Sequence, residues 1–234
     1  MPRPRAALAV LAPLLAALAL AGPAAPTQAV AAPAAGATAA AWPPPAPVLN
    51  RVDTRDPVVF ITIDDGWYHD PEAAKILLDR QVPASLFVLP DAYSWDAAYY
   101  RKLLDHGPSR LENHSVTHPD LTTLDAAGQR AELCGARNRH LAAFGAEPRL
   151  TRPPFGALNG DTAVAARACG SKAVVTWTHD QTDWGTAPAA PDLRRGDIVL
   201  LHFTPNLAKD LTRVLAAADA AGLKPAALRD YVRD

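Results

Sequence analysis

From about residue 51 to the C-terminus, short apolar runs alternate with segments in which apolar residues recur every three or four positions. The first run, Val58 to Ile63, is continuous and rich in β-branched residues, which predicts a strand buried on both faces. Asp70 and Pro71 then begin a helix, because Asp caps helix N-termini and Pro fits the first turn. The same reasoning predicts strands over residues 84–89, 149–152, 173–178 and 197–202, and helices over 70–81, 95–106, 125–144, 159–168 and 207–221.

This alternation of strands and helices is typical of a parallel α/β fold, either an open sheet or a barrel. Chemically capable side chains fall at or after the ends of the expected strands. In both fold types the carboxyl ends of the strands and their loops form the active-site face. The candidate residues at these ends are Asp64, Asp65, His114, Arg152, Asp183 and His202.

The N-terminal fifth of the chain has a different pattern. Arg3 and Arg5 are followed by a run without charge from Ala6 to Asn50. The apolar part of this run and the small residues after it predict a secretory signal peptide over residues 1–31. A membrane anchor is the alternative, but the apolar run is shorter than the roughly 20 residues of a spanning helix and contains a proline. We therefore expect a secreted or cell-wall-associated protein, with no stable membrane span after cleavage.

Residues 32–50 are mainly Ala and Pro, which predicts an extended tether before a folded domain over residues 51–234. Hydrophobic residues make up 49% of the 234-residue chain, enough for a core. The formal net charge of -1 gives no electrostatic argument for a nucleic-acid partner. Cys134 and Cys169 are the only cysteines. In an exported protein such a pair favours a disulfide over two separate buried thiols.

Two short motifs suggest a site. Asp64-Asp65-Gly66 follows a strand, where it is either simple turn chemistry or a pair of one metal ligand and one base. Neighbouring strand residues face opposite ways, so a turn at Gly66 is needed to bring both acids to the rim. His114 and His118 are four residues apart, so on a helical turn they project from one face. With a carboxylate they form a ligand set that suits zinc or non-haem iron.

Five segments, taken in order, resemble the motifs of the polysaccharide deacetylase family, the NodB-homology domain of carbohydrate esterases. The family pattern is T-F-D-D-G, H-S/T-x-x-H, R-P-P-Y/F-G, D-x-x-D-W and L-x-H. The matching segments are Thr62 to Gly66, His114 to His118, Arg152 to Gly156, Asp180 to Trp184 and Leu200 to His202. The resemblance implies a distorted (β/α) barrel with fewer than eight parallel strands and hydrolysis of acetyl groups from a carbohydrate.

Residue roles follow from the resemblance position by position. Asp65, His114 and His118 would hold a divalent metal, most often zinc in this family. Asp64 would be the general base toward the attacking water, and Arg152 would hold and orient it.

The remaining motifs imply roles on the other side of the substrate. His202 would be the general acid, with Asp183 hydrogen-bonded to it. The backbone N–H of Phe155 would stabilise the oxyanion, and Leu200 and Trp184 would wall the pocket for the acetyl methyl.

The resemblance thus implies a secreted, metal-dependent enzyme that removes acetyl groups from N-acetylglucosamine units of a polymer such as peptidoglycan or chitin. An esterase acting on O-acetylated polysaccharide is one alternative, because the same site can cleave esters. A glycan-binding module without activity is another, although no proposed catalytic position is substituted in this chain.

Overall fold

A parallel sheet is the centre of the computed structural model, which describes residues 44–233. Strand β2 (Val58–Asp65) is buried along nearly its whole length and pairs with β3 (Ser85–Val88) on one side and β8 (Ile198–His202) on the other. The strands follow the order β1-β6-β5-β4-β3-β2-β8-β7, and every pair is parallel. The other strands are β1 (Val48–Leu49), β4 (Arg110–Asn113), β5 (Leu150–Thr151), β6 (Ala173–Val175), β7 (His179–Asp180) and β9 (Lys224–Pro225), which pairs with β2.

The sheet curls into a distorted barrel, which confirms the predicted fold class. The path has eight strands rather than fewer than eight, because it includes three two-residue strands: β1 and β7 at its ends and β5 between β4 and β6. Parallel pairing brings all the carboxyl ends to one edge of the sheet.

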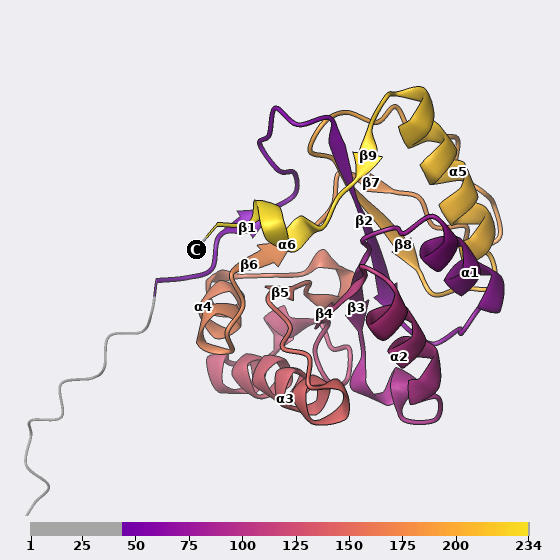
Figure 1. The fold of residues 1–234 in the computed structure, drawn as a ribbon. Coiled ribbons are helices and arrows are strands. Elements are labelled where there is room, and N and C mark those ends of the chain that lie inside the picture. Colours follow the sequence, from indigo (N-terminus) through magenta and orange to yellow (C-terminus); the bar gives the residue numbers. More distant parts are fainter. Residues whose placement is uncertain (1–43, 234) are drawn as a thin grey trace, which may run out of the picture. The chain divides into compact units, whose positions relative to one another are not determined.

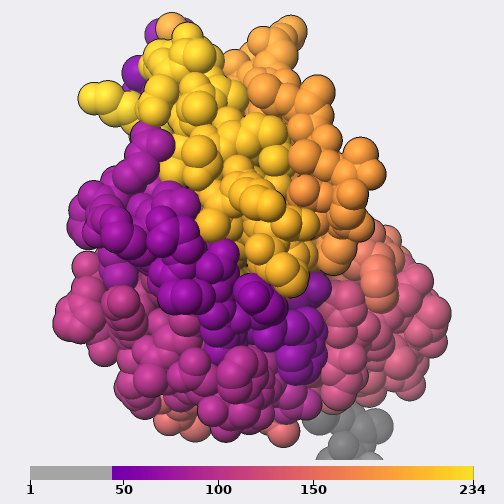
Figure 2. Space-filling view, turned by 90° about the vertical axis from the view of Figure 1, so that its right-hand side faces the viewer, coloured from indigo at the N-terminus to yellow at the C-terminus, as the bar shows by residue number. Residues whose placement is uncertain are grey.

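Helices lie around the outside of the sheet (Figure 1). They are α1 (Pro71–Asp79), α2 (Ala97–His106), α3 (Ala126–Phe144), α4 (Gly160–Ala168), α5 (Leu207–Ala220) and α6 (Leu228–Tyr231). Asp70 caps α1 as predicted, its side chain accepting a hydrogen bond from the backbone N–H of Glu72. Segments far apart in sequence lie together, as Figure 2 shows for the C-terminal α5 beside α1, where Arg80 pairs with Asp219.

The packed region begins earlier than the expected start at residue 51. Ala46 is buried, and Val48 and Leu49 pair with β6 as strand β1. The last residues of the expected tether therefore belong to the sheet. The predicted signal peptide and the rest of the tether lie outside the described residues. Within residues 44–233, no helix is both long and apolar enough to cross a membrane.

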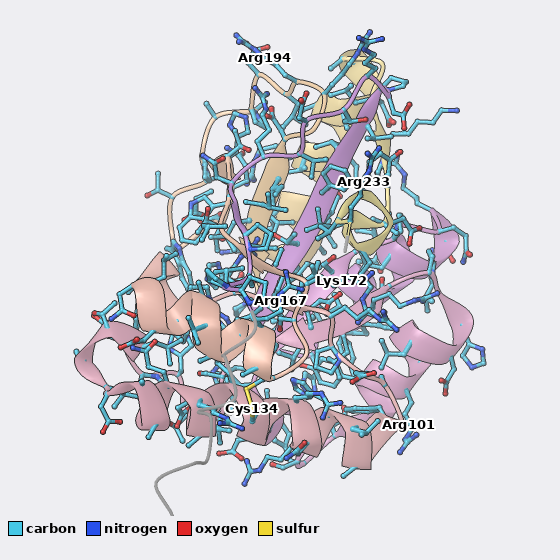
Figure 3. All side chains as sticks on the ribbon, turned by 90° about the vertical axis from the view of Figure 1, so that its left-hand side faces the viewer. Arg101, Cys134, Arg167, Lys172, Arg194 and Arg233 are labelled. Atoms are coloured by element: carbon cyan, nitrogen blue, oxygen red, sulfur yellow. A yellow bond between two sulfur atoms is a disulfide. The ribbon has the colours of Figure 1, made fainter. Side chains whose placement is uncertain are left out.

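A disulfide joins Cys134 and Cys169, as predicted. It connects α3 to the end of α4, and Figure 3 shows it between the two helices. The link matters for the site because the residues that precede Cys134 on α3 contact the loop after β4.

Candidate active site

The carboxyl ends of β2, β4, β5, β7 and β8 converge on a pocket of about 350 Å³. Nine of the ten residues expected at the site lie in or directly under this pocket, and Asp183 is the exception. The lining residues are Asp64, Asp65, His114, His118, Pro153, Phe155, Gly156, Trp177, Asp180, Trp184, Leu200 and His202.

Both acids at the end of β2 face the same histidine. Asp64 Oδ2 lies 3.8 Å from His114 Nε2, and Asp65 Oδ1 lies 3.3 Å from it. The reason is the backbone of Asp65, whose φ of 71° departs from the extended strand and turns its side chain to the pocket. The change of direction thus occurs at Asp65 itself, one residue before Gly66.

His114 and His118 lie on an irregular turn after β4 instead of the helical turn that their spacing suggested. Ser115 and His118 both have left-handed backbone conformations, with φ of 70° and 60°. Left-handed conformations are uncommon for residues with a side chain and often mark functional sites. His118 Nε2 lies 3.4 Å from Asp65 Oδ1, so both rings converge on one carboxylate oxygen.

This trio has the properties of a metal site. One ligand atom from each of Asp65, His114 and His118 lies within 4.8 Å of the others. His114 Nδ1 donates to the Arg152 carbonyl at 2.8 Å, since a carbonyl only accepts. In the neutral ring His114 Nε2 then carries a lone pair. Nε2 and Asp65 Oδ1 are both buried without a hydrogen-bond partner, which fits a cation between them.

The electrostatics of the trio favour positive charge at the same point. Burial opposes ionisation of Asp65, but the His114 and His118 imidazoles beside it hold the pKa of this carboxyl well below its usual range. Burial also opposes charging of His114, yet the nearby Asp64 and Asp65 carboxylates leave its pKa raised. The pocket therefore favours a cation beside the two carboxylates, and a divalent ion meets that demand.

Arg152 lies fully buried under the pocket and is bonded through all three guanidinium nitrogens. Nη1 donates to Asp64 Oδ1 at 2.7 Å and to Thr62 Oγ1 at 2.8 Å. Nε and Nη2 donate to the carbonyls of Val175 and Thr176. These contacts leave Asp64 Oδ2 directed to the metal trio. Burial lowers the pKa of Arg152, and the Asp64 carboxylate opposes that shift.

His202 ends β8, but its partner differs from the predicted one. Its Nδ1 lies 2.8 Å from Thr182 Oγ1. Asp183 was expected at that position, but its carboxylate accepts from the Gly185 N–H and its backbone N–H donates to Asp210. The loop after β7 thus presents Thr182 to His202. Burial lowers the pKa of His202 despite the nearby carboxylates.

Asp180, for which the sequence predicted no role of its own, belongs to the site. It lines the pocket at the end of β7, directly beside Leu200 in the sheet. Its Oδ1 accepts from the Thr182 N–H at 3.0 Å, and its charge raises the pKa of both Arg152 and His202 against the effect of burial. Its position two residues after the strand expected to end at residue 178 was the available signal.

Aromatic side chains form the open wall of the pocket. Phe155 is 70% exposed, and its ring contacts the His118 ring at 4.7 Å between centroids. Trp184 is 66% exposed, and its ring packs on the His202 ring, also at 4.7 Å between centroids. Leu200, in contrast, is buried in the floor. The pocket therefore combines a polar, charged base with exposed apolar rims, an arrangement suited to a small acyl group on a larger polar molecule.

A family model described as polysaccharide deacetylase matches residues 51–174. The chain belongs to the polysaccharide deacetylase family. An uncharacterised protein of Streptomyces coelicolor is 36% identical over 193 residues, which cover 80% of this chain and 77% of that protein. A chitooligosaccharide deacetylase of Bradyrhizobium is 31% identical over 154 residues, 62% of this chain and 69% of that one. A family 4 carbohydrate esterase from Bacillus anthracis shares the fold, with a TM-score of 0.69 and 24% identity over 79% of this chain and 86% of that one.

Proposed function

We propose that this polysaccharide deacetylase hydrolyses the acetamide of N-acetylglucosamine units in a peptidoglycan-like or chitin-like polymer, releasing acetate and a free amine. The observation that carries the proposal is the convergence of three groups in one pocket: the metal trio, the clamped carboxylate of Asp64 and the imidazole of His202. Amide hydrolysis needs an electrophilic catalyst, a base and an acid, because the amide is a poor electrophile with a basic leaving group.

Asp65, His114 and His118 are the residues that would hold the cofactor, a divalent metal and most often zinc in this family. Such an ion acts as a Lewis acid on a carbonyl and lowers the pKa of water toward about 7. The hydrogen bond from His114 Nδ1 to the Arg152 carbonyl orients the ring and keeps Nε2 directed at Asp65.

Asp64 is the proposed base. Arg152 occupies Oδ1, so Oδ2 is the oxygen that takes a proton from the attacking water. The water oxygen bonds to the acetyl carbon, and the backbone N–H of Phe155 donates to the oxyanion that develops on the carbonyl oxygen. Trp184 and Leu200 enclose the acetyl methyl.

His202 is the proposed acid. The C–N bond breaks as the imidazole gives a proton to the departing nitrogen, which leaves as a neutral amine. Thr182 fixes the ring through Nδ1, so Nε2 is the nitrogen available to the substrate. Asp180 stabilises positive charge on the ring, since burial lowers the pKa of His202 and the Asp180 carboxylate opposes that shift.

O-deacetylation is a second candidate, favoured by the lowered pKa of His202. An alkoxide departs from carbon with less need of an acid than an amide nitrogen does. The His202→Ala variant separates the two reactions. The expected result is that turnover falls about 10²-fold or more on an acetamide substrate and changes little on the matched acetyl ester. This result would show that His202 protonates the departing nitrogen.

The decisive experiment measures acetate released by the purified protein from a panel of N- and O-acetylated glycans, with chelator and after zinc is restored. Zinc-restored release supports the proposal, and the responding glycan identifies the bond. Glycan retention that is insensitive to chelator, with no acetate from any substrate, would instead favour a binding module.

Export is also part of the proposal. The pattern of residues 1–31 supports a cleaved signal peptide, which would place the enzyme outside the cell, where peptidoglycan and chitin occur. N-terminal sequencing of the protein from culture medium should start near Ala29 or Ala31. A sequence that starts at Met1 or Pro2 would contradict export by cleavage.

A further inference from the structure

The turn between His114 and His118 has no regular hydrogen-bond ladder to hold its shape. It includes two left-handed residues, Ser115 and His118, and it leaves the N–H groups of Val116 and Thr117 directed toward α3. A turn of this kind needs partners from elsewhere in the chain, because left-handed residues with a side chain persist only where the surrounding structure holds them.

Glu132 on α3 supplies those partners. Its Oε2 accepts from the backbone N–H groups of Val116 at 2.8 Å and Thr117 at 2.9 Å. Its Oε1 accepts from the Thr117 hydroxyl at 2.9 Å. Two successive N–H groups directed at one carboxylate oxygen form an anion-binding concavity, so the negative charge strengthens all three bonds.

The residues next to Glu132 attach the same helix to the same loop. The Leu133 carbonyl accepts from Asn113 Nδ2 at 2.7 Å, and Asn113 Oδ1 in turn accepts from the Ser115 N–H at 3.0 Å. Gly135 allows the close approach, since a Cβ there would lie 2.9 Å from a methyl of Val116. Cys134, between them, links α3 to α4.

We propose that Glu132 is a positioning residue for the two metal-binding histidines. By fixing the backbone of residues 116 and 117, its carboxylate sets the separation of His114 and His118, which lie on either side. Without it the turn relaxes, and the two Nε2 atoms no longer meet at Asp65 Oδ1. This inference rests on the proposed metal site, and it assigns metal affinity to a residue that touches neither metal nor substrate.

Glu132→Gln tests the inference, because the amide keeps the side-chain shape but loses the charge and one acceptor. Glu147→Gln is the matched control: Glu147 is exposed, pairs with Arg137 and lies away from the turn. The metal-stripped proteins are titrated with zinc in competition with a chromophoric chelator. The expected result is a zinc affinity 10- to 100-fold lower for Glu132→Gln and unchanged for Glu147→Gln.

A melting curve of each stripped variant distinguishes positioning from general stability. Should Glu132→Gln fold poorly, Thr117→Val removes only the hydroxyl donor to Oε1 and is expected to lower zinc affinity by a smaller factor. Equal zinc affinity in folded Glu132→Gln and the parent would overturn the role of Glu132 alone. A parent protein that binds no divalent ion would overturn this role together with the metal site.

Discussion

Nδ1 of His202 lies 2.8 Å from the hydroxyl of Thr182, while the carboxylate of Asp183 is bonded to the N–H of Gly185. Thr182→Val removes the hydroxyl with almost no change in volume and leaves the ring nitrogen without its partner. A buried hydrogen bond contributes roughly 1 kcal/mol, so we expect kcat on an acetamide substrate to fall about fivefold to tenfold.

Asp183→Asn is the comparison for that variant. It retains an oxygen for Gly185 and the backbone bond to Asp210, so kcat should remain near that of the parent. A larger loss in Asp183→Asn than in Thr182→Val would contradict the assignment of Thr182 as the partner of His202.

The difference between Thr182 and Asp183 shows what the sequence could and could not predict. Continuous apolar runs such as Val58 to Ile63 predicted the long strands, because burial on both faces leaves a clear signature. β7 is only two residues long and has no period to detect. Its register beside β8 decides which residue of the Asp180 to Trp184 segment faces His202.

The histidine turn differs from expectation for a related reason. The spacing of His114 and His118 correctly indicated that the rings could meet, but spacing holds no information on left-handed residues within the turn. The turn that contains those residues is bonded to Glu132 on α3, a contact that is set by the tertiary fold. Local pattern therefore predicted which side chains could meet, whereas long-range contacts determine the geometry in which they do.

Asp64→Asn should separate catalysis from metal binding. The amide keeps an oxygen for Arg152 but cannot take a proton from water, so we expect turnover at least about 10²-fold lower. Metal content, measured by elemental analysis of the same preparation, should be unchanged. Near-normal turnover would exclude Asp64 as the base.

Asp65→Ala should have the opposite signature. It removes the oxygen on which both histidine nitrogens converge, so bound metal should fall together with activity. Elemental analysis after purification without chelator provides the measurement, with Asp64→Asn as the metal-retaining comparison. Unchanged metal stoichiometry in Asp65→Ala would refute its assignment as a ligand.

The Cys134–Cys169 disulfide should contribute substantially to stability. It closes a loop of 35 residues, for which the chain-entropy account gives roughly 3 to 4 kcal/mol. Denaturant unfolding of the parent, with and without reductant, should therefore show a lower midpoint in the reduced protein. The double variant Cys134→Ala/Cys169→Ala should resemble the reduced parent and should not respond to reductant. A parent with two thiols that react with alkylating reagent before reduction would contradict the bridge.

His140 should make the stability of the fold sensitive to mild acid. It is buried on α3 with Nδ1 3.1 Å from the Tyr93 hydroxyl, and burial lowers its pKa to about 4. In the unfolded chain the pKa of histidine is about 6.5. Between these two values the unfolded state binds a proton that the folded state excludes, so the free energy of unfolding decreases as the pH falls from about 6.5 to about 4.

His140→Gln can still hydrogen-bond to Tyr93 but does not titrate, so it should remove that part of the pH dependence. The lowered pKa of His140 corresponds to a contribution on the order of 3 kcal/mol to the change in the free energy of unfolding across this pH range. Urea unfolding at several pH values gives the free energy of unfolding of the parent and of the variant. The difference between the two isolates the effect of His140, because the contributions of the carboxylates common to both proteins cancel. His106→Gln, which changes an exposed histidine, should preserve the parent profile. Parallel profiles for the parent and His140→Gln would show that His140 is not excluded from protonation in the folded state.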